Sequence, residues 1–272
     1  MSIRLVLGGG GARCLAHIGV LRALEERGIS VGAVAACSTG AFIGALVAAG
    51  YPSEAIKEAF DTNLLGLLSA SNDTGLLDQE NVAEHFSKVL PSSFKDLQVP
   101  FAAVATDLQK GVEVVLKRGP LIPALCASNA VPGLFDPVTL GGRDLMDGGV
   151  LNMVPVDVVQ SMGDGPTLAI EVSLPKDEEI DLHKGRGVVQ QTLQTLKGKT
   201  TLPIDLTRKA YVISQSWITE TRLAQHPPDL LIRPTFPKGI GVASFGDLEQ
   251  IVQLGYETAQ QRLAESAAFL ES

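Results

Sequence analysis

The sequence contains few cysteines and few aromatic residues, and each scarcity excludes a class of protein. Its three cysteines, Cys14, Cys37 and Cys126, are an odd number and form no CxxC pair, which argues against both a disulfide framework and a zinc site. This usage suits a reducing compartment. Aromatic residues make up only 5% of the 272 residues, so a core must be built mainly from Ala, Val, Leu and Ile.

A basic block and a long apolar run are also missing. The formal net charge is -8 at pH 7, and because nucleic-acid phosphates are bound by clustered Lys and Arg, we expect no nucleic-acid partner. The first apolar run, residues 3–7, is too short for a signal-peptide core, and no run is long enough to span a bilayer. We therefore expect a cytoplasmic protein, with any membrane contact being peripheral, at the inner surface.

The sequence does have enough apolar residues for one large core. Hydrophobic residues make up 45% of the chain and charged residues 19%, and a chain of this length lies near the upper limit for a single core. We expect one domain over residues 1–272, without internal repeats or a low-complexity linker.

Apolar runs alternate with segments of helical periodicity. Residues 3–7 are followed by a glycine run and a helical pattern that ends at Gly28, and residues 31–36 lead through Ser38 into a small-residue helix that stops at Gly50. This alternation predicts an α/β fold in which helices cover both faces of a mainly parallel sheet.

Further elements continue the pattern. Strands are expected at residues 101–105, 112–116, 167–172 and 230–232, and helices at residues 52–60, 120–127 and 245–269. Residues 144–149 are expected to form a turn. The irregular residues 64–79 are interpreted as a surface loop with a short helix, with a lid as the alternative.

Ser38 stands where a strand is expected to turn at once into a helix, in the sequence Ala36-Cys37-Ser38-Thr39-Gly40. This pattern is similar to the G-x-S-x-G nucleophile elbow, in which small neighbours let strand and helix approach closely while the hydroxyl stays exposed. Ala36 replaces the first glycine. The N–H groups that begin the helix would favour a developing oxyanion, although a serine in this position could equally be an ordinary helix cap.

A glycine run, Gly8 to Gly11, lies between the first strand and the first helix. Its backbone amides could hold a cofactor pyrophosphate or an oxyanion formed in acyl transfer. The dinucleotide pattern needs a third glycine where Arg13 or Cys14 stands, and an acidic residue at the end of the second strand. Neither is present, which leaves a nucleotide-binding Rossmann protein as a poorly supported alternative and an oxyanion hole or a structural turn as the remaining interpretations.

A serine nucleophile needs a base, and the four histidines, His17, His85, His183 and His226, offer none in a convincing context. His17 falls inside the apolar first helix and is interpreted as a packed core residue. No histidine pair has metal-ligand spacing on a predicted helix. Among the carboxylates, Asp147 stands beside glycines that permit a tight turn, but an Asp-Gly pair alone usually marks only a turn.

Taken together, these motifs resemble the patatin-like phospholipases, and particularly the bacterial members related to the catalytic domain of neuropathy target esterase. The resemblance lies within residues 5–172 and is carried by an ordered series of segments, which is more specific than any one motif. The segments are Gly8-Gly9-Gly10-Gly11-Ala12-Arg13, Leu15-Ala16-His17-Ile18-Gly19-Val20-Leu21, the Ser38 motif, Ala105-Thr106-Asp107-Leu108, residues 127–138, and Asp147-Gly148-Gly149 followed by Asn152 and Pro155.

The resemblance implies a three-layer α/β/α sandwich and a serine hydrolase. Ser38 would attack an acyl carbonyl, and Asp147 would be the general base without a histidine. Gly9-Gly10-Gly11 would form the oxyanion hole, with Arg13 as a basic neighbour. No cofactor and no metal are implied.

The implied substrate is a phospholipid, a lysophospholipid or another acyl ester, cleaved through an acyl-Ser38 intermediate. Residues 64–77 and 132–135 could border the acyl pocket or belong to an ordinary core. Cys14 and Ala36 stand where the family has glycine; neither change removes a reacting group, so we expect activity to be retained, at a level that these residues could reduce. If they spoil the oxyanion hole instead, the chain would be a catalytically silent lipid-binding or regulatory member of the same fold.

Overall fold

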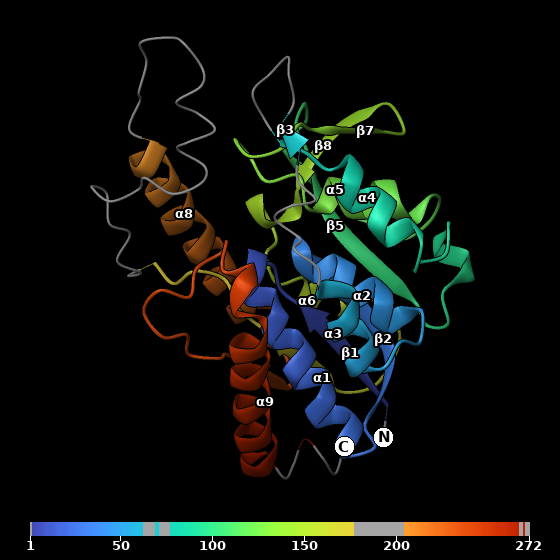
Figure 1. Cartoon of the computed structure of the whole chain (residues 1–272), viewed down its shortest axis with the longest axis vertical. Coiled ribbons are helices and arrows are strands. Elements are labelled where there is room, and N and C mark those ends of the chain that lie inside the picture. The colour runs from blue at the N-terminus through green and yellow to red at the C-terminus, as the bar shows by residue number, and fades with distance from the viewer. Residues whose placement is uncertain (1, 62–68, 71–76, 177–203, 267–268, 270–272) are drawn as a thin grey trace.

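The computed structural model describes residues 2–61, 69–70, 77–176, 204–266 and 269, and Figure 1 shows their arrangement. The strands are β1 (Ser2–Leu7), β2 (Ser30–Cys37), β3 (Ser69–Ala70), β4 (Leu77–Asp78), β5 (Phe101–Asp107), β6 (Val112–Leu116), β7 (Val138–Leu140), β8 (Arg143–Asp147), β9 (Thr167–Ile170) and β10 (Leu230–Ile232). The α-helices are α1 (Ala16–Glu26), α2 (Thr39–Ala48), α3 (Ser53–Phe60), α4 (Glu80–Ser87), α5 (Leu121–Ser128), α6 (Val156–Gln160), α8 (Ile204–Gln225) and α9 (Leu248–Glu265). Short 3-10 helices include η1 (Gly11–Leu15), η4 (Gly148–Val150) and η5 (Phe245–Asp247).

A mixed, mostly parallel sheet forms the centre of the described molecule. Hydrogen bonds link the strands in the order β10-β9-β1-β2-β5-β8-β7. Strands β2 and β8 pair with successive parts of one edge of β5, and β6 pairs with its other edge. β1 is parallel to β2 and β9, β9 to β10, and β2 to β5. β5 is buried along its whole length, as expected for a strand with helices on both faces.

Helices on both faces give three layers. Alternate residues of β1 and β2, such as Leu5 and Val34, share one core with α1, α2, α3 and α9. The intervening residues, such as Val6 and Ala35, share a second core with α6 and with Leu223 near the end of α8. The expected three-layer α/β/α fold is therefore confirmed.

The antiparallel end of the sheet differs from the sequence-based expectation. Residues 143–147 form strand β8, not part of a turn, and β8 runs antiparallel to both β5 and β7. Strand β8 was not predicted because its sequence contains no apolar run. Only Leu145 and Asp147 are buried in it. The turn signal marks only its end, where η4 follows.

Several helices and one loop also differ from the expected elements or lie outside the described residues. The C-terminal helix is shorter than expected, because α9 begins at Leu248, after η5, and ends at Glu265. Helices α4, α6 and α8 were not predicted. Most of the segment interpreted as a loop or lid, residues 62–68 and 71–76, lies outside the described residues. In the described part of the chain, no helix combines the length and the apolar character needed to cross a membrane.

Candidate active site

Strand β5 brings the ends of β2 and β8 together. β6 pairs with residues 103–107 of β5, so β2 and β8 must share the other edge. On that edge Cys37, the last residue of β2, is opposite Val104, and Asp147, the last residue of β8, is opposite Ala105. Because β2 and β8 run in opposite directions, their carboxyl ends meet, which places Ser38 beside Asp147.

Ser38 lies in a strained turn between β2 and α2. Its φ of 56° is the only positive φ of a non-glycine residue in the described part of the chain, and such a conformation costs on the order of 1–3 kcal/mol. The Ser38 N–H donates to Ser128 Oγ at 3.1 Å, and its carbonyl accepts from the Ala41 N–H at 2.8 Å. Its side chain does not cap α2. The geometry resembles that of a nucleophile elbow and differs from that of an ordinary helix cap.

Small residues let α2 approach the sheet at this elbow. A Cβ at Gly40 would lie 2.6 Å from the Gly8 carbonyl oxygen, closer than real Cβ atoms come. One turn further, a Cβ at Gly44 would lie 3.1 Å from the Ala36 methyl group. Gly44 therefore leaves room for the methyl group that Ala36 adds to the elbow.

Asp147 is a buried carboxylate with one oxygen unpaired. Its side chain is 1% exposed. Oδ1 accepts from the Gly149 N–H at 2.7 Å and from Cys37 Sγ at 3.6 Å, whereas Oδ2 makes no hydrogen bond with any described residue. Burial raises the pKa of Asp147 to about 6, against the hydrogen bonds from Gly149 and Cys37 and the nearby Ser38 hydroxyl, which lower it. A carboxylate with this pKa is suited to accept a proton near neutral pH.

The Ser38 hydroxyl lies between two acceptors. It donates to Asn129 Oδ1 at 3.4 Å, which is long for a hydrogen bond between oxygens. It also lies close enough to Asp147 to lower the pKa of that carboxyl, although its hydrogen-bond geometry favours Asn129 in this state. The hydroxyl has one proton, so it cannot donate to Asn129 and to Asp147 at the same time.

His17 and Cys14 support the glycine run from inside the core. His17 Nε2 donates to the Gly8 carbonyl oxygen at 2.7 Å, and Cys14 Sγ donates to the same oxygen at 3.4 Å. Burial lowers the pKa of His17 to about 4 and raises the pKa of Cys14, so both groups are neutral at pH 7. Cys14 does not need a positive φ, which removes the backbone reason for a glycine there. No described histidine hydrogen-bonds to Ser38 or Asp147.

The glycine run passes directly against Ser38, since a Cβ at Gly9 would lie 2.8 Å from Ser38 Cβ. Three N–H groups of this segment are already bonded: Gly8 to Ile170 O at 3.0 Å, Gly9 to Met153 O at 3.1 Å and Ala12 to Val242 O at 2.9 Å. The N–H groups of Gly10 and Gly11 make no hydrogen bond within the described residues. The N–H groups of Gly10 and Gly11 therefore remain available to a ligand. Gly9 has no side chain, which lets the loop lie close to Ser38. Arg13 follows in η1, buried, with its guanidinium 4.0 Å from the ring centroid of Phe236.

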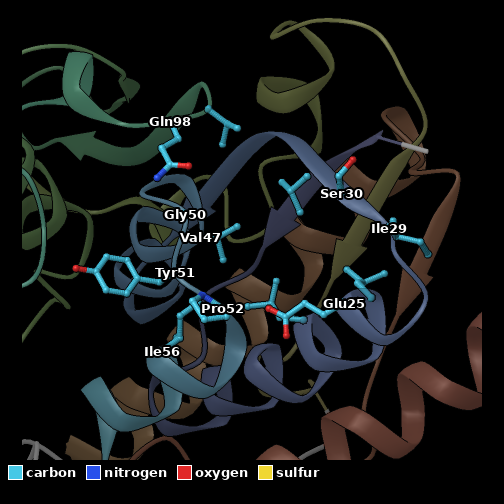
Figure 2. A pocket seen from close by; sticks show the side chains of 13 residues that line it. Glu25, Ile29, Ser30, Val47, Gly50, Tyr51, Pro52, Ile56 and Gln98 are labelled. Atoms are coloured by element: carbon cyan, nitrogen blue, oxygen red, sulfur yellow. The ribbon is translucent and has the colours of Figure 1, made fainter.

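The cavity in Figure 2 is separate from this site. It has a volume of about 310 Å³ and is lined mainly by apolar residues, with Glu25 and Gln98 at its wall. Ser30, at the start of β2, borders it, whereas Ser38 follows the end of the same strand. A strand of this length spans roughly 25 Å, so the cavity does not serve the Ser38 site.

The structure adds three residues that sequence reasoning did not assign to the site. Ser128 and Asn129 contact Ser38; they belong to a segment that carries the family resemblance, but local sequence gives them no role. Gln215 of α8 donates to the Gly149 carbonyl oxygen at 3.0 Å. No signal in the sequence marks Gln215, because it is one polar residue in a mixed helix far from the motifs. The described residues contain no cluster of His, Cys, Asp or Glu that could hold a metal ion.

Comparisons with known proteins agree with the fold and with the motifs. The family model for patatin-like phospholipases matches residues 5–159. An uncharacterized NTE family protein of Mycobacterium tuberculosis is 38% identical over 176 residues, which cover 63% of this chain and 49% of that protein. Patatin-like phospholipase domain-containing protein 6 of Homo sapiens is 30% identical over 275 residues, which cover 94% of this chain and 20% of that protein.

One further relative and one solved structure extend the comparison. A lysophospholipase of Pyricularia oryzae is 29% identical over 279 residues, which cover 94% of this chain and 18% of that protein. The crystal structure of VipD from Legionella pneumophila shares the fold with a TM-score of 0.59 and 14% identity, covering 97% of this chain and 66% of that one. The chain spans about half the length of its mycobacterial relative. With a family model that covers more than half of its length, the chain belongs to the patatin-like phospholipase family.

Proposed function

We propose that this chain is a serine hydrolase that cleaves lipid carboxylic esters, with Ser38 as nucleophile and Asp147 as general base. One observation carries the proposal: the strained Ser38 stands beside a buried Asp147 whose Oδ2 has no hydrogen-bond partner among the described residues. Strain and an unpaired buried oxygen both cost stability. A reaction that uses them explains why they occur together.

The proposed reaction begins with transfer of the Ser38 hydroxyl proton to Asp147 Oδ2. Ser38 Oγ then forms a bond to the carbonyl carbon of the ester, and the carbonyl oxygen takes the negative charge. The N–H groups of Gly10 and Gly11 donate to that oxygen. The ester C–O bond breaks, and the leaving alcohol takes the proton from Asp147.

The acyl-Ser38 intermediate is discharged by the same groups. Asp147 takes a proton from a water molecule, whose oxygen attacks the acyl carbon, and the proton returns to Ser38 Oγ as the acid leaves. Every proton in this scheme passes between substrate or water and the two named side chains. The scheme therefore uses no metal and no cofactor.

The proposed substrates are phospholipids or lysophospholipids. One relative at 29% identity is named a lysophospholipase, which supports this class. Pro132 and Leu134, which follow Asn129 closely in the chain, are only partly buried and are proposed to border the acyl chain. Specificity for an acyl chain depends on such apolar contacts more than on the dyad.

The test is hydrolysis of a series of p-nitrophenyl esters and of a lysophospholipid by the wild type, Ser38→Ala and Asp147→Asn. We expect both variants to lose turnover by about 10³-fold or more. Asp144→Asn is the matched control, because Asp144 lies on the same strand and bonds Thr139 instead of the site, and it should keep wild-type turnover. Lipid binding by a wild type that turns over no ester would replace the proposal with the silent, lipid-binding alternative.

A further inference from the structure

The C-terminal end of α5 holds the nucleophile through two consecutive side chains. Ser128, which is fully buried, accepts the Ser38 N–H at 3.1 Å. Asn129 Oδ1 accepts both the Ser38 hydroxyl at 3.4 Å and the Thr39 hydroxyl at 3.1 Å. The proposed reaction assigns a role to neither residue. Their contacts nevertheless control the backbone and the side chain of Ser38 separately.

The direction of the Asn129 amide is set by Gln79. The backbone carbonyl of Cys126 can only accept a hydrogen bond, so Gln79 must turn its Nε2 toward it, at 3.1 Å. Gln79 Oε1 then faces Asn129 and accepts from its Nδ2 at 3.2 Å. Reversing either amide would bring two donors or two acceptors together. The chain of contacts therefore leaves Asn129 Oδ1 directed at Ser38.

We propose that Asn129, oriented by Gln79, is a positioning residue that holds the Ser38 side chain in the rotamer that faces Asp147. This inference rests on the proposed function. A serine side chain free of such a contact divides its time among three staggered rotamers. The Asn129 contact is long, and a carboxylate is a stronger acceptor than a neutral amide, so the hydroxyl, which also lies near Asp147, can turn its proton from Asn129 Oδ1 to that carboxylate.

Labelling of Ser38 by a fluorophosphonate tests the inference, because its rate reports the reactivity of that hydroxyl. Spreading Ser38 over three rotamers slows the reaction about threefold, and misplacement of the oxygen brings the loss to about tenfold. We expect Asn129→Ala to slow labelling and to lower kcat by about this factor while leaving KM nearly unchanged. Gln79→Ala should cause a smaller loss, and the double variant should be no slower than Asn129→Ala.

Gln98→Ala is the matched control. Gln98 also donates its Nε2 to a backbone carbonyl, that of Ala49 at 2.9 Å, but it lies at the wall of the cavity in Figure 2, away from Ser38. We expect it to label at the wild-type rate. Thermal melting of every variant separates reactivity from folding, and if Asn129→Ala does not fold, the Gln79→Ala comparison decides the question.

Two results would overturn the positioning role alone: wild-type labelling rates in folded Asn129→Ala, or losses in Asn129→Ala and Gln79→Ala that multiply in the double variant. A wild type that does not label would overturn the proposed function and this inference with it. The two failures are therefore distinguishable in one experiment.

Discussion

At the scale of single residues, the proposed role of Asp147 as general base ties activity to its pKa. Burial raises this pKa to about 6, and in the proposed reaction Asp147 must be ionised to take the serine proton. We expect kcat/KM for ester hydrolysis to rise with pH, to reach half its maximum near pH 6, and to become level above about pH 7. A profile without an acid limb would contradict the role of Asp147.

A change at Cys37 should shift the acid limb of this pH profile. Its thiol contacts Asp147 Oδ1 at 3.6 Å and lowers the pKa of the carboxyl, and burial raises the pKa of the thiol itself, so it stays protonated. Cys37→Ala removes this donor, and we expect the acid limb to move to higher pH. Cys126→Ala, a change at another buried cysteine, should leave the limb in place. Identical profiles for the two variants would show that the thiol does not act on Asp147.

The buried, ionised Asp147 should also lower the free energy of unfolding above about pH 6. Its folded pKa of about 6 lies above the ordinary value of 3.8, so the folded state binds the proton more tightly than the unfolded state, and stability is lost as pH rises from about 4 to about 6. Since this raised pKa corresponds to at most about 3 kcal/mol, we expect Asp147→Asn to be about 1–3 kcal/mol more stable than wild type at pH 8. Urea unfolding at pH 8 and pH 4 checks this. The difference should shrink toward pH 4, and a less stable variant at pH 8 would contradict it.

At the scale of elements, close contact between α2 and the end of β1 fixes the position of the Ser38 turn relative to the glycine run. An added Cβ at Gly40 would meet the carbonyl oxygens of Gly8 and Leu7 at 2.6 and 2.8 Å. We expect Gly40→Ala to destabilise the protein by about 1–3 kcal/mol and to lower turnover, because the loop that carries Gly10 must shift. Gly246→Ala, with open space around its Cβ, should change neither melting temperature nor turnover. Equal behaviour of the two variants would show that the contact is not needed.

The elements also show what the sequence could and could not predict. The elbow at Ser38 was predictable because its signals are local, namely an apolar run followed by small residues. Its meeting with Asp147 was predictable only through family resemblance, because it requires β8 to pair with the edge of β5 that β2 also uses. Strand β8 has two buried residues, Leu145 and Asp147, and this pattern is too short to predict a strand.

The glycine run illustrates the same limit. Its glycines are evident in the sequence, but which N–H groups stay unpaired depends on distant partners. Met153 takes the Gly9 N–H and Val242 takes the Ala12 N–H. No local pattern links these residues, so the choice of Gly10 and Gly11 as proposed donors needed the structure.

At the scale of the whole molecule, the part of the chain beyond the recognisable motifs supports the site. β10 extends the central sheet, and α9 lies along α1 (Figure 1). The backbones of these helices touch, since a Cβ at Gly255 would lie 2.0 Å from the Ala16 carbonyl oxygen and one at Gly19 would lie 1.9 Å from that of Val252. Helix α9 is therefore in direct backbone contact with α1, a helix within the segment that carries the family motifs.

This packing predicts that a change far from Ser38 weakens the whole fold. We expect Gly255→Ala to lower stability by about 1–3 kcal/mol or more in a single cooperative transition seen by both circular dichroism and loss of esterase activity. Gly241→Ala, where an added Cβ meets nothing within 4 Å, is the control. Loss of activity without loss of stability in Gly255→Ala would show that α9 acts on the site directly.

The assignment of Ser38 as nucleophile is tested most directly by mass spectrometry of the intact protein and its peptides after treatment with a fluorophosphonate. The structure predicts one adduct per chain, located on Ser38, absent from Ser38→Ala, strongly slowed in Asp147→Asn, and forming more slowly as pH falls through about 6. An adduct on another residue, or none in the wild type, would contradict the Ser38 and Asp147 dyad.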